Sequence, residues 1–139
     1  PKWNGMVGRT DKQALLPYEM CDRVQYFPCN VKDWRQFVDS LRPLKFNEQL
    51  EKVNDYANGF PYTLDPLNWN LEDYWETPYE FHAVSGDCED YAITKYYSLR
   101  ALGLPAERLR IMVVQDFNLG GIIHAVLGVY EGDRLYILD

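Results

Sequence analysis

Three residues of this sequence have the types and the order that catalysis by a thiol nucleophile requires: Cys88, His124 and Asp139. A histidine beside a cysteine takes the thiol proton, and a carboxylate beside the histidine fixes its tautomer and stabilises the imidazolium. Each residue type by itself is weak evidence, because structural cysteines and core histidines are common. In combination the three predict a Cys-His-Asp group brought together by the fold.

The sequence around Cys88 favours a helix that begins at the thiol. The cap-type residues Ser85 and Asp87 precede it, and apolar residues then recur at helical spacing. A thiol at a helix N-terminus lies at the positive end of the helix dipole, which favours the nucleophilic thiolate. The alternative is a buried structural cysteine, against which the polar residues on either side of Cys88 count.

His124 and Asp139 are predicted to lie on neighbouring strands. His124 interrupts an apolar run, and the run that ends at Asp139 is predicted to pair with it through a turn at 131–134. Such a hairpin places the two residues nearly opposite each other, so that the carboxylate can orient the ring. The alternatives are a satisfied core histidine and a strand-end aspartate that faces water.

Three acidic residues flank the thiol: Asp87, Glu89 and Asp90. They suit a helix cap and the first turn of a helix, and they equally provide the start of a calcium site, which needs six to eight oxygen ligands. Their charges raise the pKa of a neighbouring thiol, and a bound cation would cancel that effect. The residues alone leave both interpretations open.

The order of the predicted elements indicates an α+β fold, with helices first and a small antiparallel sheet after them. A first helical pattern ends at Pro43, and a second begins at Phe46. The nucleophile helix ends at Gly103, and strand patterns follow it. The sequence thus predicts one domain over 1–139: an irregular arm at 1–30, helices at 31–60, an aromatic loop at 61–87, the nucleophile helix at 88–103 and antiparallel strands at 109–139.

Composition excludes two classes of partner. The 139 residues are 47% apolar and carry a net charge of −7 without a basic face, so no nucleic-acid binding is expected. No apolar stretch approaches the roughly 18 residues of a membrane span, and the opening Pro-Lys-Trp-Asn is not a signal peptide, so no direct membrane insertion is expected.

Cys21 and Cys29 form either a disulfide, which would indicate an oxidising compartment, or two ordinary buried thiols.

The run Gly-Asp-Cys-Glu-Asp-Tyr-Ala at 86–92 resembles the LapG-type family of bacterial transglutaminase-like cysteine proteases. The segments 73–80, 99–103, 124–127 and 137–139 are similar to that family as well, and the resemblance extends from Trp34 to the last residue. It implies a papain-like or transglutaminase-like fold with Cys88, His124 and Asp139 as the triad. By analogy with transglutaminases, Trp75 is the expected oxyanion donor beside the Cys88 main-chain N–H.

The same resemblance implies a function. It implies a calcium-dependent periplasmic endopeptidase, with Asp87, Glu89 and Asp90 as metal ligands, that cuts the N-terminal region of a large surface adhesin and so disperses biofilm. It also implies inhibition by an inner-membrane receptor for cyclic di-GMP. Two alternatives stay open: a transglutaminase or other amide acyltransferase with the same triad, and a catalytically idle domain that binds calcium or a protein.

Overall fold

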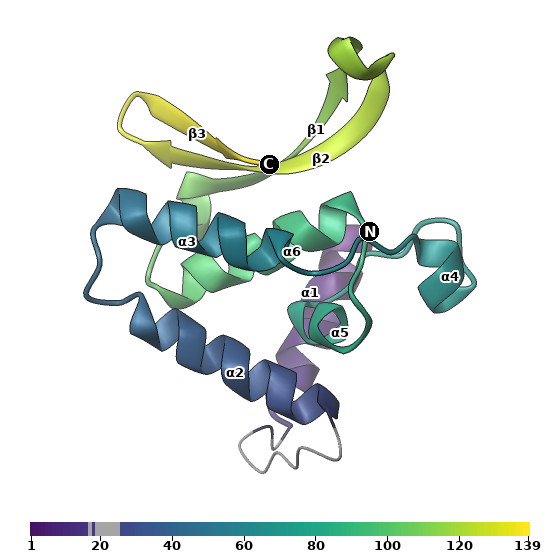
Figure 1. The fold of residues 1–139 in the computed structure, drawn as a ribbon, viewed down its shortest axis with the longest axis horizontal. Coiled ribbons are helices and arrows are strands. Elements are labelled where there is room, and N and C mark those ends of the chain that lie inside the picture. Colours follow the sequence, from purple (N-terminus) through teal and green to yellow (C-terminus); the bar gives the residue numbers. More distant parts are fainter. Residues whose placement is uncertain (17, 19–25) are drawn as a thin grey trace.

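A computed structural model describes residues 1–16, 18 and 26–139 as a helical layer covered by a small sheet (Figure 1). The α+β prediction, with a transglutaminase-like arrangement of helices before strands, is confirmed. The helices are α1 (Lys2–Gln13), α2 (Tyr26–Ser40), α3 (Phe46–Asn58), α4 (Asp65–Trp69), α5 (Pro78–Val84) and α6 (Cys88–Ala101), with short 3-10 turns η2 (Ala106–Arg108) and η3 (Phe117–Leu119); the strands are β1 (Leu109–Asp116), β2 (Ile122–Glu131) and β3 (Arg134–Leu138).

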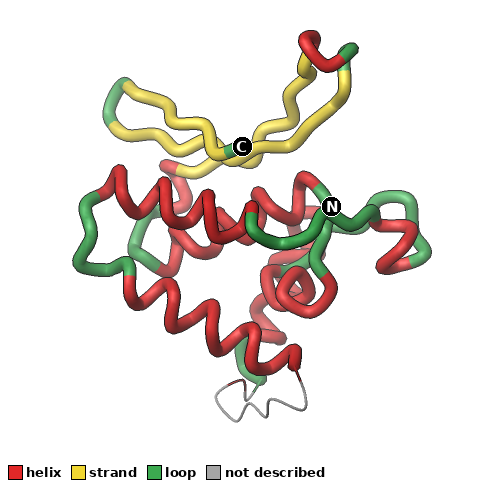
Figure 2. The backbone as a smooth tube through the Cα atoms, viewed as in Figure 1, coloured by secondary structure: helices red, strands yellow, loops and turns green. Residues whose placement is uncertain are grey.

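The sheet is antiparallel in the order β1-β2-β3. The β1–β2 pairing runs from Leu109↔Val129 to Asp116↔Ile122, whereas β3 pairs only with the second half of β2. The far end of the β1–β2 hairpin therefore extends past β3 and away from the helices (Figure 2). Its turn contains two glycines with positive φ, Gly120 and Gly121, a conformation that other residues rarely adopt.

Helix α6 lies at the centre of the molecule and packs against both the sheet and the other helices. On the sheet side, Leu99 joins a core cluster with Leu127 and Val129 of β2 and with Val53 of α3. On the opposite side, the Trp34 indole N–H of α2 donates a hydrogen bond of 2.9 Å to the Ser98 hydroxyl. Because α6 is enclosed from both sides, its first residue, Cys88, is held in a fixed place relative to the sheet.

The predicted irregular arm at 1–30 is wrong for Lys2–Gln13, which form α1. Two glycines and few apolar residues weaken the helical pattern here, and tertiary contacts stabilise the helix instead. Arg9 donates a 2.6 Å hydrogen bond to the Trp75 carbonyl oxygen and pairs with Glu80. The proposed Cys21–Cys29 disulfide involves Cys21, which lies outside the described residues; Cys29 is buried.

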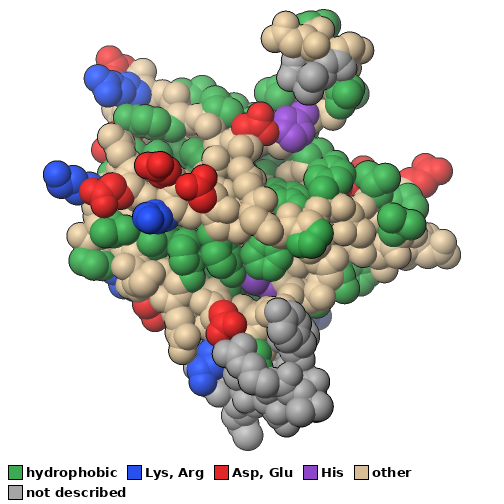
Figure 3. Space-filling model, in the orientation of Figure 1, with side chains coloured by type: hydrophobic (Ala, Val, Ile, Leu, Met, Phe, Trp, Pro, Cys, Tyr) green, Lys and Arg blue, Asp and Glu red, His purple; other side chains and the backbone are tan. Residues whose placement is uncertain are grey.

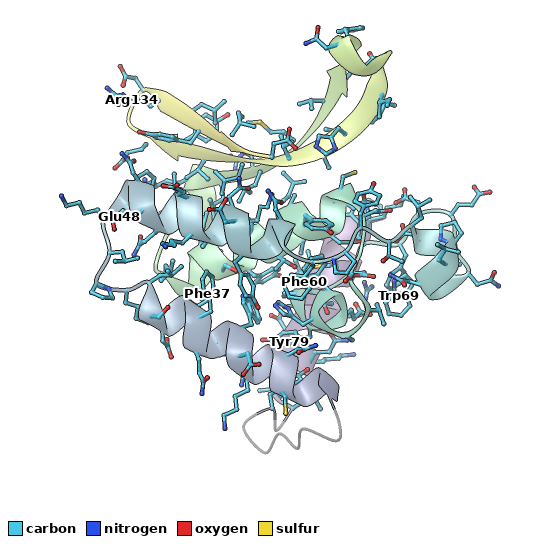
Figure 4. All side chains as sticks on the ribbon, in the orientation of Figure 1. Phe37, Glu48, Phe60, Trp69, Tyr79 and Arg134 are labelled. Atoms are coloured by element: carbon cyan, nitrogen blue, oxygen red, sulfur yellow. The ribbon has the colours of Figure 1, made fainter. Side chains whose placement is uncertain are left out.

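The predicted aromatic loop at 61–87 contains two short helices, α4 and α5. Thr77 and Glu80 form a reciprocal capping box that begins α5, a signal in the sequence that the many prolines and rings obscured. Trp69 lies on α4 (Figure 4), and its indole N–H donates to the buried Glu76 at 2.7 Å.

Within the described ranges, no helix combines the length and the apolar character that crossing a membrane requires.

Replacement of Leu99 by Ala is expected to lower the free energy of unfolding by about 2–5 kcal/mol, because it opens a cavity between α6 and the sheet. The matched control is Leu67→Ala on α4, whose side chain is 79% exposed and should change stability by less than about 0.5 kcal/mol. Chemical denaturation of both variants measures the difference. Equal effects would contradict the central position of α6.

Candidate active site

Cys88, His124 and Asp139 line one cleft of about 270 Å³ between the first turn of α6 and the sheet. Phe60 and Tyr62, which follow α3, form its opposite side. In Figure 3 a histidine and an acidic side chain touch above a hollow at the base of the hairpin. The structure therefore brings the three predicted residues, far apart in sequence, to a single surface depression.

Lys95 also lines this cleft, although its side chain is buried in the body of α6. Burial lowers its pKa to about 8, against the opposing influence of Asp139. The cleft thus contains a cation close to the carboxylate, which the sequence did not reveal, because a lysine in a helix ordinarily faces solvent.

Cys88 is the first residue of α6, after the N-cap Asp87. Its thiol donates a hydrogen bond to Glu89 Oε2 at 3.2 Å. Burial raises the thiol pKa to about 11, with further increases from Glu89 and Asp87, while the Ala125 N–H lowers it. In the absence of a cation, the helix N-terminus is therefore too weak to produce a thiolate at neutral pH.

His124 and Asp139 are joined by a hydrogen bond, with Nε2 and Oδ1 2.6 Å apart. If the β2–β3 register continues by one residue, Asp139 faces Val126, so His124 and Asp139 form a diagonal pair on neighbouring strands. The Asn58 and Asn54 amides of α3 donate to the Asp139 carbonyl oxygen at 3.0 and 3.4 Å. These contacts fasten the backbone of Asp139 to the helical layer.

The other histidine, His82, is structural. Its Nδ1 is 2.6 Å from the Pro78 carbonyl oxygen and its Nε2 is 2.9 Å from the Tyr56 hydroxyl, so both ring nitrogens are engaged. Burial lowers its pKa to about 4, which keeps the ring neutral. His124 is therefore the histidine that the fold leaves available for chemistry.

The acidic residues beside the thiol belong to a larger cluster. Ligand oxygens of Asp65, Asp87 and Asp90 lie within 4.8 Å of one another, as do those of Asp65, Asp73 and Glu89. Asp65 and Asp73 come from the segment at 61–87, and the sequence analysis missed them, since nothing in the local sequence sets them apart from other loop aspartates. Only the folding of that segment over α6 brings them to Asp87.

Asp90 holds this arrangement together through both of its oxygens. Oδ1 accepts the Glu76 N–H at 2.8 Å, and Oδ2 accepts the Asp87 N–H at 3.0 Å. Gly86 lies so close that a Cβ atom at this position would be 2.4 Å from Oδ2. A glycine is therefore required where the chain enters the nucleophile turn.

The cluster has properties that suit a divalent cation. Burial raises the pKa values of Asp65, Asp87 and Asp90, and in Asp87 and Asp90 neighbouring carboxylates raise them further. Oδ1 of Asp65 and Oδ1 of Asp87 are buried without a hydrogen-bond partner. Crowded carboxylates with unpartnered oxygens are stabilised by a hard cation, for which calcium prefers such oxygen ligands.

Trp75, the expected oxyanion donor, does not line the cleft of Cys88. It lines a separate cavity with Trp3 and Tyr96, where α1 contacts it. Tyr62 lines that cleft instead; burial raises the pKa of its phenol, and the Cys88 main-chain N–H lowers it. Arg9 of α1 donates a hydrogen bond to the Trp75 carbonyl oxygen, and this contact holds Trp75 beside α1.

Comparison with known proteins identifies the family. The family model of the bacterial transglutaminase-like cysteine proteinases (BTLCP) matches residues 9–139. The chain belongs to this family. Among curated proteins, no match to this chain was found.

Solved structures of LapG from Legionella pneumophila are similar to this chain. Calcium-bound LapG has a TM-score of 0.75 and 34% sequence identity, over 96% of this chain and 71% of LapG. EGTA-treated LapG has a TM-score of 0.74 at the same identity, over 96% and 69% of the two chains. The match to the family model and the similarity to LapG together support a cysteine protease.

The raised pKa of the Cys88 thiol predicts the pH dependence of its alkylation. In EGTA, the rate of iodoacetamide labelling is expected to rise about tenfold per pH unit from pH 7 to about pH 9.5 without levelling, because only the thiolate reacts and its midpoint lies near 11. Mass spectrometry of the Cys88 peptide gives the rate. In the urea-unfolded chain, as control, the rate should reach half of its maximum near pH 8.5 and level about one pH unit higher; a half-maximum near pH 8.5 in the folded protein would contradict the prediction.

Proposed function

We propose that this chain is a calcium-dependent cysteine endopeptidase in which Cys88 is the nucleophile, His124 its base and Asp139 the residue that orients the base. The observation that carries the proposal is the 2.6 Å contact between His124 Nε2 and Asp139 Oδ1 in the cleft that Cys88 lines. Because Nε2 is occupied by the carboxylate, Nδ1 is the ring nitrogen left for the thiol. Burial raises the thiol pKa, but the main-chain N–H of Ala125, the residue after His124, lowers it, which supports an approach of the sulfur to the same strand.

The proposed reaction is acyl transfer to water. Nδ1 of His124 takes the Cys88 proton, the sulfur attacks the peptide carbonyl carbon, and the imidazolium then gives its proton to the leaving amine. A water molecule, activated by the neutral His124, releases the acyl group from the sulfur. Asp139 keeps the ring in the correct tautomer and stabilises its cationic form throughout.

The acidic cluster is the proposed calcium site, with Asp87, Glu89 and Asp90 as expected from the family resemblance and with Asp65 and Asp73 added by the fold. When bound, the cation would supply positive charge that cancels the effect of these carboxylates on the Cys88 thiol. LapG, which is 34% identical to this chain, has been solved both calcium-bound and EGTA-treated. The unpartnered oxygens of Asp65 and Asp87 support the same role in this chain.

The biological setting follows from the family resemblance. We propose that the substrate is an extended, small-residue segment near the N-terminus of a large adhesin, that cleavage releases the adhesin and disperses biofilm, and that the enzyme acts in the periplasm. The proposed regulator is an inner-membrane receptor for cyclic di-GMP that withholds the protease from its substrate. The open cleft between Tyr62 and the sheet is compatible with an extended peptide.

Wild-type protein with calcium is expected to cut an adhesin N-terminal fragment at one site, whereas Cys88→Ala should lose at least about 10⁴-fold in rate, since no other group can form the acyl intermediate. His124→Ala should lose a similar amount. Gel electrophoresis and mass spectrometry of the products measure the cleavage.

The control for these variants is His82→Gln, which removes the other histidine, a residue that does not line the cleft of Cys88. Retained cleavage by His82→Gln at temperatures where it stays folded supports the assignment of His124. Cleavage by Cys88→Ala at the wild-type rate would refute the protease proposal. Incorporation of a labelled amine into a glutamine donor in place of hydrolysis would instead establish a transglutaminase.

Calcium is expected to raise the melting temperature of the wild-type protein, and Asp65→Asn should weaken calcium binding at least about tenfold, because it removes one negative charge from the cluster. Without calcium, Asp65→Asn should be at least as stable as the wild type at pH 7, since a carboxyl group whose pKa is raised by folding destabilises the fold when ionised. Asp133→Asn in the β2–β3 turn is the control and should leave binding unchanged. Calorimetric titration with calcium decides between these outcomes.

A further inference from the structure

The proposed triad leaves one part of an acyl-transfer site without a residue. Attack on a carbonyl places negative charge on its oxygen, and this oxyanion is usually stabilised by two hydrogen-bond donors. The Cys88 main-chain N–H at the start of α6 is in place to be one donor. Trp75, the donor expected from the sequence, lies in another cavity.

Tyr62 is fixed to the nucleophile turn by its backbone and by its ring. Its backbone forms a parallel bridge with Gly86, and the next residue, Thr63, donates its N–H to the Gly86 carbonyl oxygen at 2.8 Å. Its ring stacks on Tyr91 of α6 with centroids 6.0 Å apart and an interplanar angle of 15°. Tyr91 is itself held by a hydrogen bond of 2.5 Å from its hydroxyl to the Phe60 carbonyl oxygen.

The phenol oxygen of Tyr62 lies where a substrate oxygen would be expected. Tyr62 lines the cleft of Cys88. Burial raises the pKa of its phenol, and the Cys88 main-chain N–H lowers it, so this N–H acts on the phenol oxygen. A carbonyl attacked by the sulfur must present its oxygen to that same N–H, so the phenol marks this position in the resting structure. Because Tyr62 is 61% exposed, a small rotation of its side chain can vacate the position while its hydroxyl stays close by.

We propose that Tyr62 is a further catalytic residue, whose O–H donates the second hydrogen bond to the oxyanion alongside the Cys88 N–H. This inference rests on the proposed function of Cys88 as nucleophile. In the step concerned, the bond between Sγ and the carbonyl carbon forms and the carbonyl π pair moves to oxygen. The phenol keeps its proton, and collapse of the intermediate returns the electron pair as the leaving group departs.

Tyr62→Phe tests the proposal, because it retains the ring stacked on Tyr91 and removes only the hydroxyl. In calcium-loaded protein, acylation of Cys88 by p-nitrophenyl acetate is expected to slow about 100-fold, since this reaction passes through an oxyanion. Alkylation of Cys88 by iodoacetamide, which forms no oxyanion, should keep the wild-type rate. Tyr130→Phe, on the part of β2 far from the cleft, is the matched control and should change neither rate.

Each other outcome overturns the proposal. Unchanged or faster acylation by Tyr62→Phe would mean that the hydroxyl only occupies the position, and an equal loss of acylation and alkylation would mean that it acts through the thiol. A wild-type Cys88 that is alkylated but never acylated would show that no oxyanion site exists. Failure of the protease proposal is separate: Cys88 would then be acylated by the ester while the adhesin fragment stays intact.

Discussion

The carboxylate of Asp90 is the interaction on which the rest of the site depends. It joins the main chain of the segment at 61–87, at Glu76, to the main chain of the nucleophile turn, at Asp87, across the space left by Gly86. Both partners are backbone groups, so the connection determines where the chain itself runs. The same residue also belongs to the acidic cluster. Asp90 therefore both fixes the position of the thiol and contributes to the crowding of carboxylates that a cation would relieve.

The part of the site that the sequence predicted is the part encoded by local patterns. Cap-type residues and helical spacing place Cys88 at a helix start, and a strand–turn–strand pattern brings His124 to Asp139. Asp65 and Asp73 could not be predicted, because their approach to the thiol depends on the path of a segment with many prolines and aromatic rings. Local periodicity contains no information on such a path.

Helix α1 and the position of Trp75 also depend on long-range contacts, which local sequence patterns do not reveal. The helix has little apolar character of its own and forms because Arg9 reaches across the molecule to Glu80 and the Trp75 carbonyl oxygen. Analogy placed Trp75 at the nucleophile, but Trp75 lines a different cavity, which it shares with Trp3 of α1. Tyr62, an unremarkable residue after a proline in the sequence, takes the position beside Cys88 because its backbone pairs with Gly86.

The way in which Asp139 is anchored separates folding from chemistry at this position. Two amides of α3, from Asn54 and Asn58, grip its carbonyl oxygen, an atom that every amino acid possesses. These two hydrogen bonds therefore do not depend on which side chain is attached there, and the carboxylate is left to act on His124 and on the nearby Lys95. A substitution at position 139 can thus change the hydrogen bond to His124 while the backbone contacts to Asn54 and Asn58 remain.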